Sequence, residues 1–503
     1  MNTAVYGSAL LALFILSGCG GESRTASDES LDTKLREKIS GFGVKGDPSL
    51  NRDIPSIEDA KTQLGKKLFY TKALSLDFDT ACVSCHHPLL GGGDDLSFPI
   101  GSEAMDPNLL GPGRMHQDTG KSYFDGGPTV PRNAPSTFNA ALFDVGMFWD
   151  NRVESKTGAA GANGGLATNI LMPGHSDYER VESVVNNLPS TQALFPITSA
   201  EEMRAFGHAD LSNGDAVRLY LAKRLSGADG NRDLSESERE AWLQAFRTGL
   251  NAPDANASEL ITIENIAEAI GEYERSQLFV NTPWKAYVEG DSTAISEKAK
   301  QGALLFYSGY EEGGANCVQC HSGDFFTDEA LHVMAVPQIG RGKNHDGSTE
   351  DYGRANITLQ DADKYKFRTA PLLNVSSTGP WGHSGAFTSL RNVVKHMLNP
   401  DESTQNYNPY SELKQRGIDV QCQDVETNTA HALAQLVINR QKGISPHQSV
   451  AFSEEQIDQI VAFLETLSDP CVEDRNCLSP WIAHPDDPDF LLLRQLNATF
   501  QRF

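Results

Sequence analysis

The chain has 503 residues, of which 39% are hydrophobic, and it carries a formal net charge of −25. A chain of this length holds about two to four ordinary domains with apolar cores. The excess of acidic side chains disfavours nucleic acid as a partner, because phosphates repel it. The same charge favours docking of a basic protein, although an acidic surface also serves solubility alone.

The first 18 residues carry no charged side chain and contain the apolar run 9–16, which Ser17, Gly18 and Cys19 follow. This pattern is typical of a lipoprotein signal peptide, with Cys19 as the lipidated first residue of the mature chain. An ordinary secretory signal cut nearby is the alternative. The run is too short for a comfortable membrane span. We therefore expect a periplasmic protein that is anchored to the membrane through lipid only, with a polar tether over residues 19–50.

Two predicted helices each precede a similar cysteine motif. The stretch Ser56–Asp59 resembles a capping box and predicts a helix that runs to Tyr70. Ser296 is the expected N-cap of the second helix. The residues Leu68-Phe69-Tyr70 recur as Leu305-Phe306-Tyr307 before the second motif, which indicates an internal repeat of two similar units.

The motifs themselves are Cys82-Val-Ser-Cys85-His86 and Cys317-Val-Gln-Cys320-His321. Each has the C-x-x-C-H pattern of a c-type haem attachment site. The two thiols can form thioethers to both vinyl groups of one haem, and the histidine can coordinate its iron. A redox pair or half of a zinc site is the alternative for a single copy. Two copies, both followed by histidine, favour two covalently bound haem c groups.

The remaining cysteines permit one disulfide. The chain has eight cysteines, of which one is assigned to lipid and four to haem, so that Cys422, Cys471 and Cys477 remain. An oxidising compartment allows a disulfide, and Cys471 and Cys477 are the local candidate pair. Cys422 either competes for one of them or stays a free thiol, and the sequence leaves both possibilities open.

The fold class follows from helical periodicity and from the scarcity of strand signals. Apolar side chains recur at helical spacing over 264–279, and Ser453 begins another helix that runs to Leu467. Stretches rich in glycine and proline, such as 91–135 and 155–176, predict long loops. We therefore predict a mostly α protein of two cytochrome-c-like haem domains. The predicted organisation is an N-terminal haem domain over 51–290, a C-terminal haem domain over 291–470 and an extension over 471–503.

Several further stretches point to one family. Besides the haem motifs they are Leu64–Tyr70, Gly91–Leu96, Arg132–Ala140, Phe148–Arg152, Asp351–Arg354, Phe367–Val375 and His383–Gly385. Together they resemble the bacterial dihaem cytochrome c peroxidase family, which includes the dihaem enzymes that oxidise tryptophan in partner proteins. The resemblance runs from about Leu64 to about Pro400, with insertions near 103–131 and 155–190.

This resemblance implies a peroxidatic N-terminal haem and a C-terminal haem that stores electrons at higher potential. The chain would then reduce hydrogen peroxide to water with electrons from a small donor protein, either a cytochrome c or a cupredoxin-like protein. The resemblance also implies a homodimer. Two alternatives stay open, which are a dihaem oxidase that modifies a partner protein or an organic substrate, and a non-enzymatic dihaem electron carrier.

The resemblance also assigns ligands to the second haem and to a calcium ion between the haems. The axial methionine of the family falls on Met397, whose thioether would raise the reduction potential. The adjacent His396 is the alternative ligand and predicts a lower potential. Calcium would bind the side chain of Asn133 and the backbone carbonyls of Thr378 and Pro380, since oxygen ligands suit this ion.

Two catalytic roles carry over in the same way. The acid–base glutamate of the family falls on Glu202, within a Gln-Ala…Pro…Glu-Met pattern over 192–203. A carboxylate above the iron can move the proton that peroxide cleavage requires. The alternative is a solvated helix charge, as we expect for Glu201. Trp149 matches the tryptophan between the haems and would relay electrons, although packing alone is the alternative.

One departure from the family concerns the sixth site of the peroxidatic iron. In many members a histidine after the Gly-Gly loop blocks this iron until the other haem is reduced. Ser102 stands at that position here, and serine is a poor haem ligand. We therefore predict an iron that is open even when fully oxidised. His116 in the first insertion and His175 in the second are the alternative ligands.

Overall fold

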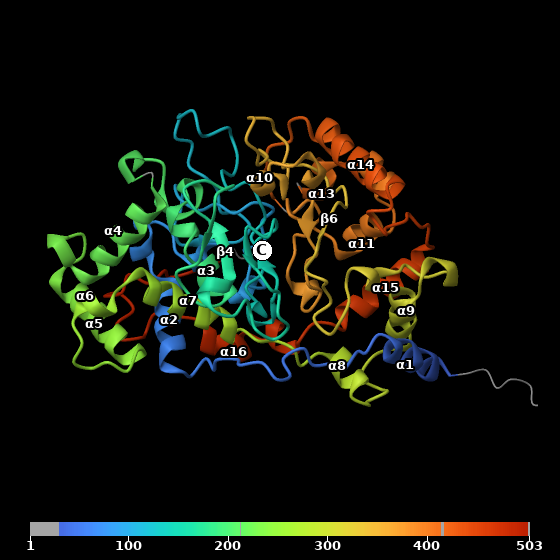
Figure 1. Cartoon of the computed structure of the whole chain (residues 1–503), viewed down its shortest axis with the longest axis horizontal. Helices are drawn as coiled ribbons and strands as arrows, with labels where there is room; N and C mark the ends of the chain where they lie inside the picture. Colours follow the sequence, from blue (N-terminus) through green and yellow to red (C-terminus); the bar gives the residue numbers. More distant parts are fainter. Residues whose placement is uncertain (1–29, 212, 414–416, 501–503) are drawn as a thin grey trace, which may run out of the picture.

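The protein is built from two similar helical units side by side, as the computed structural model of residues 30–211, 213–413 and 417–500 shows (Figure 1). With the predicted bounds, we call residues 51–290 the first unit and residues 291–470 the second unit. Helices α2 to α7 of the first unit lie on the left of this view, and helices α9 to α15 of the second unit lie on the right. The helices of the described chain are α1 Leu31–Gly41, α2 Ala60–Tyr70, α3 Leu188–Gln192, α4 Gly214–Ser226, α5 Glu236–Gly249, α6 Ala257–Leu260, α7 Ile263–Ser276, α8 Pro283–Val288, α9 Glu297–Tyr307, α10 Ala355–Thr358, α11 Leu390–Leu398, α12 Pro400–Asn406, α13 Pro409–Leu413, α14 Val425–Gln441, α15 Glu454–Glu465 and α16 Arg475–Leu478. The prediction of a mostly α fold is confirmed.

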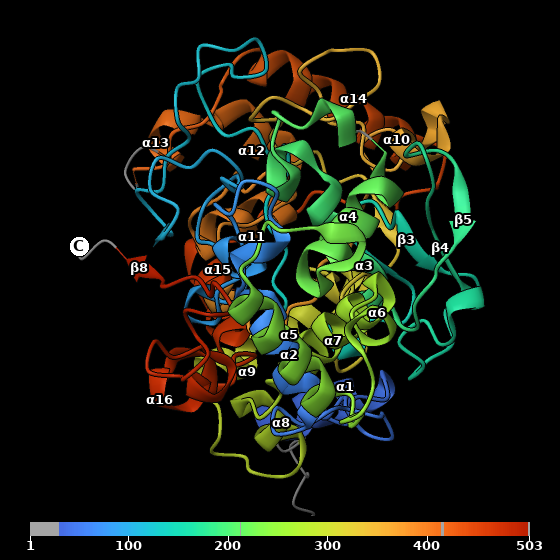
Figure 2. The same ribbon diagram turned by 90° about the vertical axis from the view of Figure 1, so that its left-hand side faces the viewer.

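Strands are short and form three small sheets. They are β1 Leu109–Leu110, β2 Gly146–Met147, β3 Val153–Ser155, β4 Ile170–Pro173, β5 Arg180–Glu182, β6 Leu331–His332, β7 Phe367–Arg368 and β8 Thr499–Phe500. One sheet has the antiparallel order β2-β3-β4-β5, another pairs β6 with β7, and β1 pairs in parallel with β8. Within the second insertion, where loops were expected over 155–176, strands β4 and β5 thus join a sheet at the edge of the molecule (Figure 2).

The internal repeat is visible as the same helix crossing in both units. Helix α2 packs against α7 in the first unit, and α9 packs against α15 in the second. A glycine stands at each crossing. A Cβ atom on Gly65 would lie 1.9 Å from the carbonyl oxygen of Ala269, and one on Gly302 would lie 1.8 Å from that of Gln459. Only the absence of a side chain lets the two backbones approach this closely.

The predicted caps are right for one of these helices and wrong for the other. Ser296 caps α9 by accepting a hydrogen bond from the backbone N–H of Ala299. Helix α2 begins at Ala60 rather than near Ser56, and its N-cap is Asp59. The Asp59 carboxylate accepts from the backbone N–H of Ser56 at 2.8 Å, so the stretch Ser56–Asp59 forms a turn before the helix.

The tether expected over 19–50 is wrong for residues 31–41, which form helix α1. Ser30 caps this helix, and Leu35 and Ile39 are buried within the core that includes α9. Lys38 also forms an ion pair with Glu312 at 2.8 Å. A composition rich in charge hid two apolar side chains at helical spacing, and these suffice to attach the segment to the second unit. The predicted signal peptide 1–18 and Cys19 lie outside the described residues.

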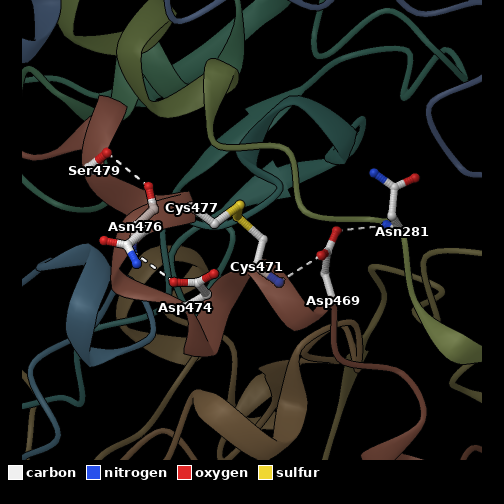
Figure 3. Close-up of a disulfide and its surroundings, with 7 residues drawn as sticks. All are labelled: Asn281, Asp469, Cys471, Asp474, Asn476, Cys477 and Ser479. Atoms are coloured by element: carbon white, nitrogen blue, oxygen red, sulfur yellow. Dashed lines mark hydrogen bonds between the residues drawn. A yellow bond between two sulfur atoms is a disulfide. The ribbon is translucent and has the colours of Figure 1, made fainter.

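The C-terminal extension returns to the first unit. Phe490, Leu493 and Leu496 are buried in the same core as α2 and α7. Beyond them, β8 pairs with β1 in the first insertion. The extension begins with a disulfide between Cys471 and Cys477, which confirms the local pairing (Figure 3). Cys422 is a free thiol.

No helix in the described ranges is both long and apolar enough to cross a membrane. The lipid anchor stays a prediction, because the cysteine that would carry it precedes those ranges.

Replacement of Gly302 by alanine should destabilise the second unit, although alanine is the better helix former. The new methyl group would meet the backbone of α15, and overpacking of this kind costs about 1–3 kcal/mol. Thermal unfolding followed by circular dichroism measures this loss. Gly41→Ala, at the end of α1 with nothing within 4 Å of the added atom, is the matched control and should change little. Equal melting temperatures for the two variants would contradict a tight crossing.

Candidate haem cavities

Two cavities are each lined by one of the two cysteine motifs. The first has a volume of about 810 Å³ and is lined by Cys82, Cys85 and His86. The second has a volume of about 280 Å³ and is lined by the equivalent stretch Cys317–His321. The structure thus places the predicted attachment residues of each motif around a single void.

The four thiols are free to form thioethers. None of them takes part in a disulfide. In each motif the first cysteine begins a short 3-10 helix, Cys82–Ser84 or Cys317–Gln319, which brings the second thiol to the same cavity. Burial raises the pKa of Cys82 and of Cys317 to about 12, so both are neutral thiols at ordinary pH.

The two motif histidines are oriented as metal ligands. His86 Nδ1 donates to the carbonyl of Gly92 at 3.2 Å, and His321 Nδ1 donates to the carbonyl of Phe326 at 3.0 Å. This second-nitrogen contact fixes the ring and leaves Nε2 available for a metal. Burial lowers the pKa of His86 to about 4, so the ring is neutral and can coordinate iron. The residues present therefore fit one covalently attached haem c in each cavity.

The structure separates the two candidates for the sixth ligand of the second iron. Met397, on α11, lines the second cavity. His396 is buried elsewhere, where its Nδ1 bonds Ser403 Oγ at 3.1 Å and its Nε2 donates to the carbonyl of Met334 at 2.9 Å. Both nitrogens of His396 are thus already engaged, which favours Met397 as the ligand.

Glu202 lines the first cavity together with His86. It lies in a π-helical turn, Ala200–Arg204, that Ser199 caps by accepting from the Glu202 N–H at 3.3 Å. Burial raises the pKa of the Glu202 carboxyl, and the nearby Arg152 opposes this effect. The side chain is therefore not a fully solvated helix charge. Glu201 instead accepts a hydrogen bond from Ser199 Oγ at 2.9 Å.

Ser102 holds the turn that carries Glu202. Its hydroxyl donates to the carbonyl of Ala200 at 2.8 Å, and its N–H donates to the carbonyl of Glu201 at 3.2 Å. Beside it, a Cβ on Gly101 would lie 2.4 Å from the Glu201 carbonyl oxygen. Sequence reasoning considered Ser102 only as a missing ligand and missed this contact, because a lone serine carries no signal of it.

Neither alternative histidine lines the first cavity. His116 Nδ1 donates to the carbonyl of Gln117 at 2.7 Å, and its ring stacks on Phe124. His175 lies beside Glu179, with 71% of its side chain exposed. Among the described histidines, His86 alone lines this cavity.

Trp149 lines both cavities, so it stands between the two predicted haems. Its indole N–H donates to the carbonyl of Asn133 at 2.9 Å. Asn133, Thr378 and Pro380, the predicted calcium ligands, all line the second cavity. The Asn133 amide donates to the Leu96 carbonyl at 2.9 Å, which leaves its side-chain oxygen available to a cation.

Two buried charged groups near the cavities were missed by sequence reasoning. Arg132 joins Asp150 of the first unit to Asp351 of the second, with both ion pairs at 2.6 Å. Glu274, on α7, lines the first cavity without a hydrogen bond to any described residue, and burial raises its pKa to about 8. Arginine, aspartate and glutamate are so common in sequences that nothing marks these residues before the fold is known.

Two cavities that each combine a pair of attachment thiols with a neutral histidine define a dihaem protein of the c type. Comparison with known proteins points to the same class. Residues 59–293 match the family described as di-haem cytochrome c peroxidase, which implies two c-type haems. Because its relatives include cytochrome c peroxidases, the chain is an oxidoreductase of the peroxidase type.

The relatives include methylamine utilization proteins and cytochrome c peroxidases. The chain is 26% identical to the methylamine utilization protein MauG of Methylophilus methylotrophus, over 67% of this chain and 71% of that protein. It is 25% identical to the cytochrome c551 peroxidase of Pseudomonas aeruginosa, over 68% and 73% of the two chains. A MauG-like protein associated with microbial copper homeostasis has a similar fold, with a TM-score of 0.51 and 19% identity over 85% of this chain and 96% of that one.

Glu274→Gln should flatten the pH dependence of stability. The folded carboxyl has a pKa of about 8 against an ordinary value of 4.5, so the native state holds a proton that the unfolded chain releases between these values. Stability therefore falls as pH rises across this window, by at most about 1.4 kcal/mol per pH unit from this group. Denaturant unfolding between pH 5 and 8 measures the slope. Glu264→Gln, exposed on the same helix, should leave the slope as it is, and an unchanged slope in Glu274→Gln would contradict the assignment.

Proposed function

We propose that the protein reduces hydrogen peroxide to water and that the first cavity is its peroxidatic site. The observation that carries the proposal is the placement of Glu202 and His86 around one cavity, with no second described histidine there to close the iron. A proton-carrying carboxyl facing an open metal site is what peroxide cleavage needs. An electron carrier would instead benefit from filled coordination at both irons.

His86 would hold a haem in this cavity, and that haem would supply the redox chemistry that cleaves peroxide. Glu202 would carry a proton from one oxygen of the peroxide to the other, so that the second leaves as water. The overall reaction consumes two electrons and two protons and yields two water molecules per peroxide. Because burial raises its pKa, Glu202 can take up and release this proton closer to neutral pH than an exposed glutamate.

Electrons would enter at the second haem and reach the first past Trp149. Met397 as the axial ligand would raise the potential of the second haem, which suits an electron store. A small donor protein, such as a cytochrome c or a cupredoxin-like protein, is the expected source. Calcium bound by Asn133, Thr378 and Pro380 would fix the segment between the two cavities. The periplasmic location, the lipid anchor and the homodimer stay predictions.

A second candidate is oxidation of a partner protein, and one surface feature favours it. Large apolar side chains are exposed on both insertions, Met105 and Met115 on the first and Leu166 and Tyr178 on the second. Exposed apolar side chains gathered on loops near a site are typical of docking surfaces. The relative MauG is named for methylamine utilization rather than for peroxide removal. Poor turnover with every small donor would support this candidate.

Glu202→Gln should lower peroxide turnover by about 10²–10⁴-fold, because the amide cannot carry the proton. The absorption spectra of both haems should stay nearly unchanged, since Glu202 is not a proposed ligand. Stopped-flow mixing with peroxide measures the loss. Glu236→Gln, exposed on α5, is the control and should react as the wild type does. Full activity in Glu202→Gln would remove Glu202 from the mechanism.

The fully oxidised protein should give a high-spin ferric EPR signal beside a low-spin one, because the hydroxyl of Ser102 points to the Ala200 carbonyl and not into the cavity. Peroxide should abolish the high-spin signal without any added reductant. A low-temperature spectrum before and after peroxide addition makes this measurement. Two low-spin signals that do not change when peroxide is added would instead indicate a sixth ligand on the first iron. Replacement of His116 and of His175 would then identify this ligand.

A further inference from the structure

Six basic side chains line the first cavity, and two of them differ from the rest. The six are Arg132, Arg152, Arg204, Arg341, Lys343 and Arg368. Four of these bind protein acceptors, since Arg132 holds two aspartates and the other three donate to backbone carbonyls. Within the described chain, the charged groups of Arg152 and Lys343 donate no hydrogen bond to the protein.

Arg152 is a partly buried side chain whose guanidinium donates no hydrogen bond to a described residue. Only 14% of its side chain is exposed, and its nearest carboxylate is Asp150 at 3.9 Å. That carboxylate is already engaged by Arg132 at 2.6 Å. The guanidinium lies over the ring of Phe148 at 3.7 Å, and its Nε is buried without a partner. Buried donors are nearly always satisfied in proteins, so this arrangement indicates an absent acceptor.

Lys343 reaches the same cavity from the second unit. Its side chain is 22% exposed, and its nearest carboxylate is Asp177 at 4.0 Å, on the turn between β4 and β5. Burial lowers the pKa of Lys343, and the positive charges of Arg152 and Arg132 lower it further. The positive charges of Arg152 and Lys343 repel each other across the cavity, and an anion bound between them would offset this repulsion.

The buried ion pairs of Arg132 fix both cations in place. Asp150 precedes Arg152 by two residues and accepts from its backbone N–H at 3.2 Å. Asp351 pairs as a β-bridge with Lys343. Since Arg132 binds both aspartates, it sets the positions of Arg152 and Lys343 on either side of the boundary between the units.

We propose that Arg152 and Lys343 together form a carboxylate-binding site in the first cavity. A guanidinium fork and an ammonium group beside it match the two oxygens of a carboxylate. This chemistry has two sources, a propionate of the first haem or the carboxylate of a free molecule that enters the cavity. The inference rests on the proposed placement of a haem in this cavity. The positive charges of Arg152 and Lys343 both lower the pKa of Glu202. A carboxylate bound to these two side chains would therefore reduce this effect.

The test compares Arg152→Gln, Lys343→Gln and the double variant with wild type. Arg232→Gln and Lys121→Gln, two exposed positions, remove the same charges outside the cavity and are the controls. One arm titrates the oxidised protein with acetate and follows the Soret band. The other arm measures the reduction potential of the first haem without acetate. Haem content and circular dichroism establish that each variant has folded.

A free carboxylate as the ligand predicts saturable spectral changes with acetate in the wild type. Each single variant should then weaken acetate binding by about tenfold or more, the effect of losing one charge-assisted hydrogen bond, and the controls should not. A haem propionate as the ligand predicts no response to acetate. Instead, the potential of the first haem should fall in each variant and most in the double variant, because positive charge next to the haem is lost.

Absence of both responses in folded variants would overturn the site. If a glutamine variant fails to load haem, the charge-conserving variants Arg152→Lys and Lys343→Arg are measured instead. Because they keep the positive charge, they should keep most of the acetate response or of the reduction potential of the wild type. Neither arm uses peroxide. A protein that ignores peroxide but shows one of these responses would therefore disprove the peroxidase proposal and leave the carboxylate site standing.

Discussion

The buried ion pairs of Arg132 are the interaction on which the arrangement of the two units depends. Arg132 and Asp150 come from the first unit and Asp351 from the second, and all three side chains are buried. Removal of one partner from such a cluster typically costs about 3–5 kcal/mol, because a buried charge is left unpaired. Trp149 lies directly before Asp150, so the same contact fixes the indole between the cavities. Electron transfer between two haems needs a constant separation, and this cluster supplies a rigid link.

Within each unit the main constraint is the close approach of two helix backbones. A glycine stands at the crossing of α2 with α7 and at the crossing of α9 with α15. The helix before each cysteine motif is therefore held close against its partner helix. Each cysteine motif follows its helix after a short connecting segment and lines one cavity. Repetition of this arrangement explains how one chain builds two cavities that are each lined by a cysteine motif. The differences between them arise from what covers each cavity, namely Met397 in one and the Glu202 turn in the other.

Sites built from residues close together in the sequence could be predicted, whereas contacts between distant segments could not. The spacing of Cys82–His86 and Cys317–His321 was enough to predict two sites, and the proximity of Cys471 and Cys477 was enough to predict the disulfide that the structure confirms. Helix α1 was missed because its charged residues outnumber the two that become buried. The sheet over β3, β4 and β5 was missed because these strands span only three or four residues each. Arg152 and Lys343 could not be linked at all, since their proximity exists only once both units have folded.

The path of the C-terminal extension has a consequence for biosynthesis. Phe490, Leu493 and Leu496 complete the core around α2, although α2 is made more than 400 residues earlier. A chain that emerges from its N-terminus therefore cannot close the first unit until its last segment has arrived. Cys82 packs against this same core, so the first cysteine motif would be less enclosed during that interval, and haem attachment could precede the pairing of β8 with β1. The order of synthesis would thus keep the earlier site accessible for longer than the later one.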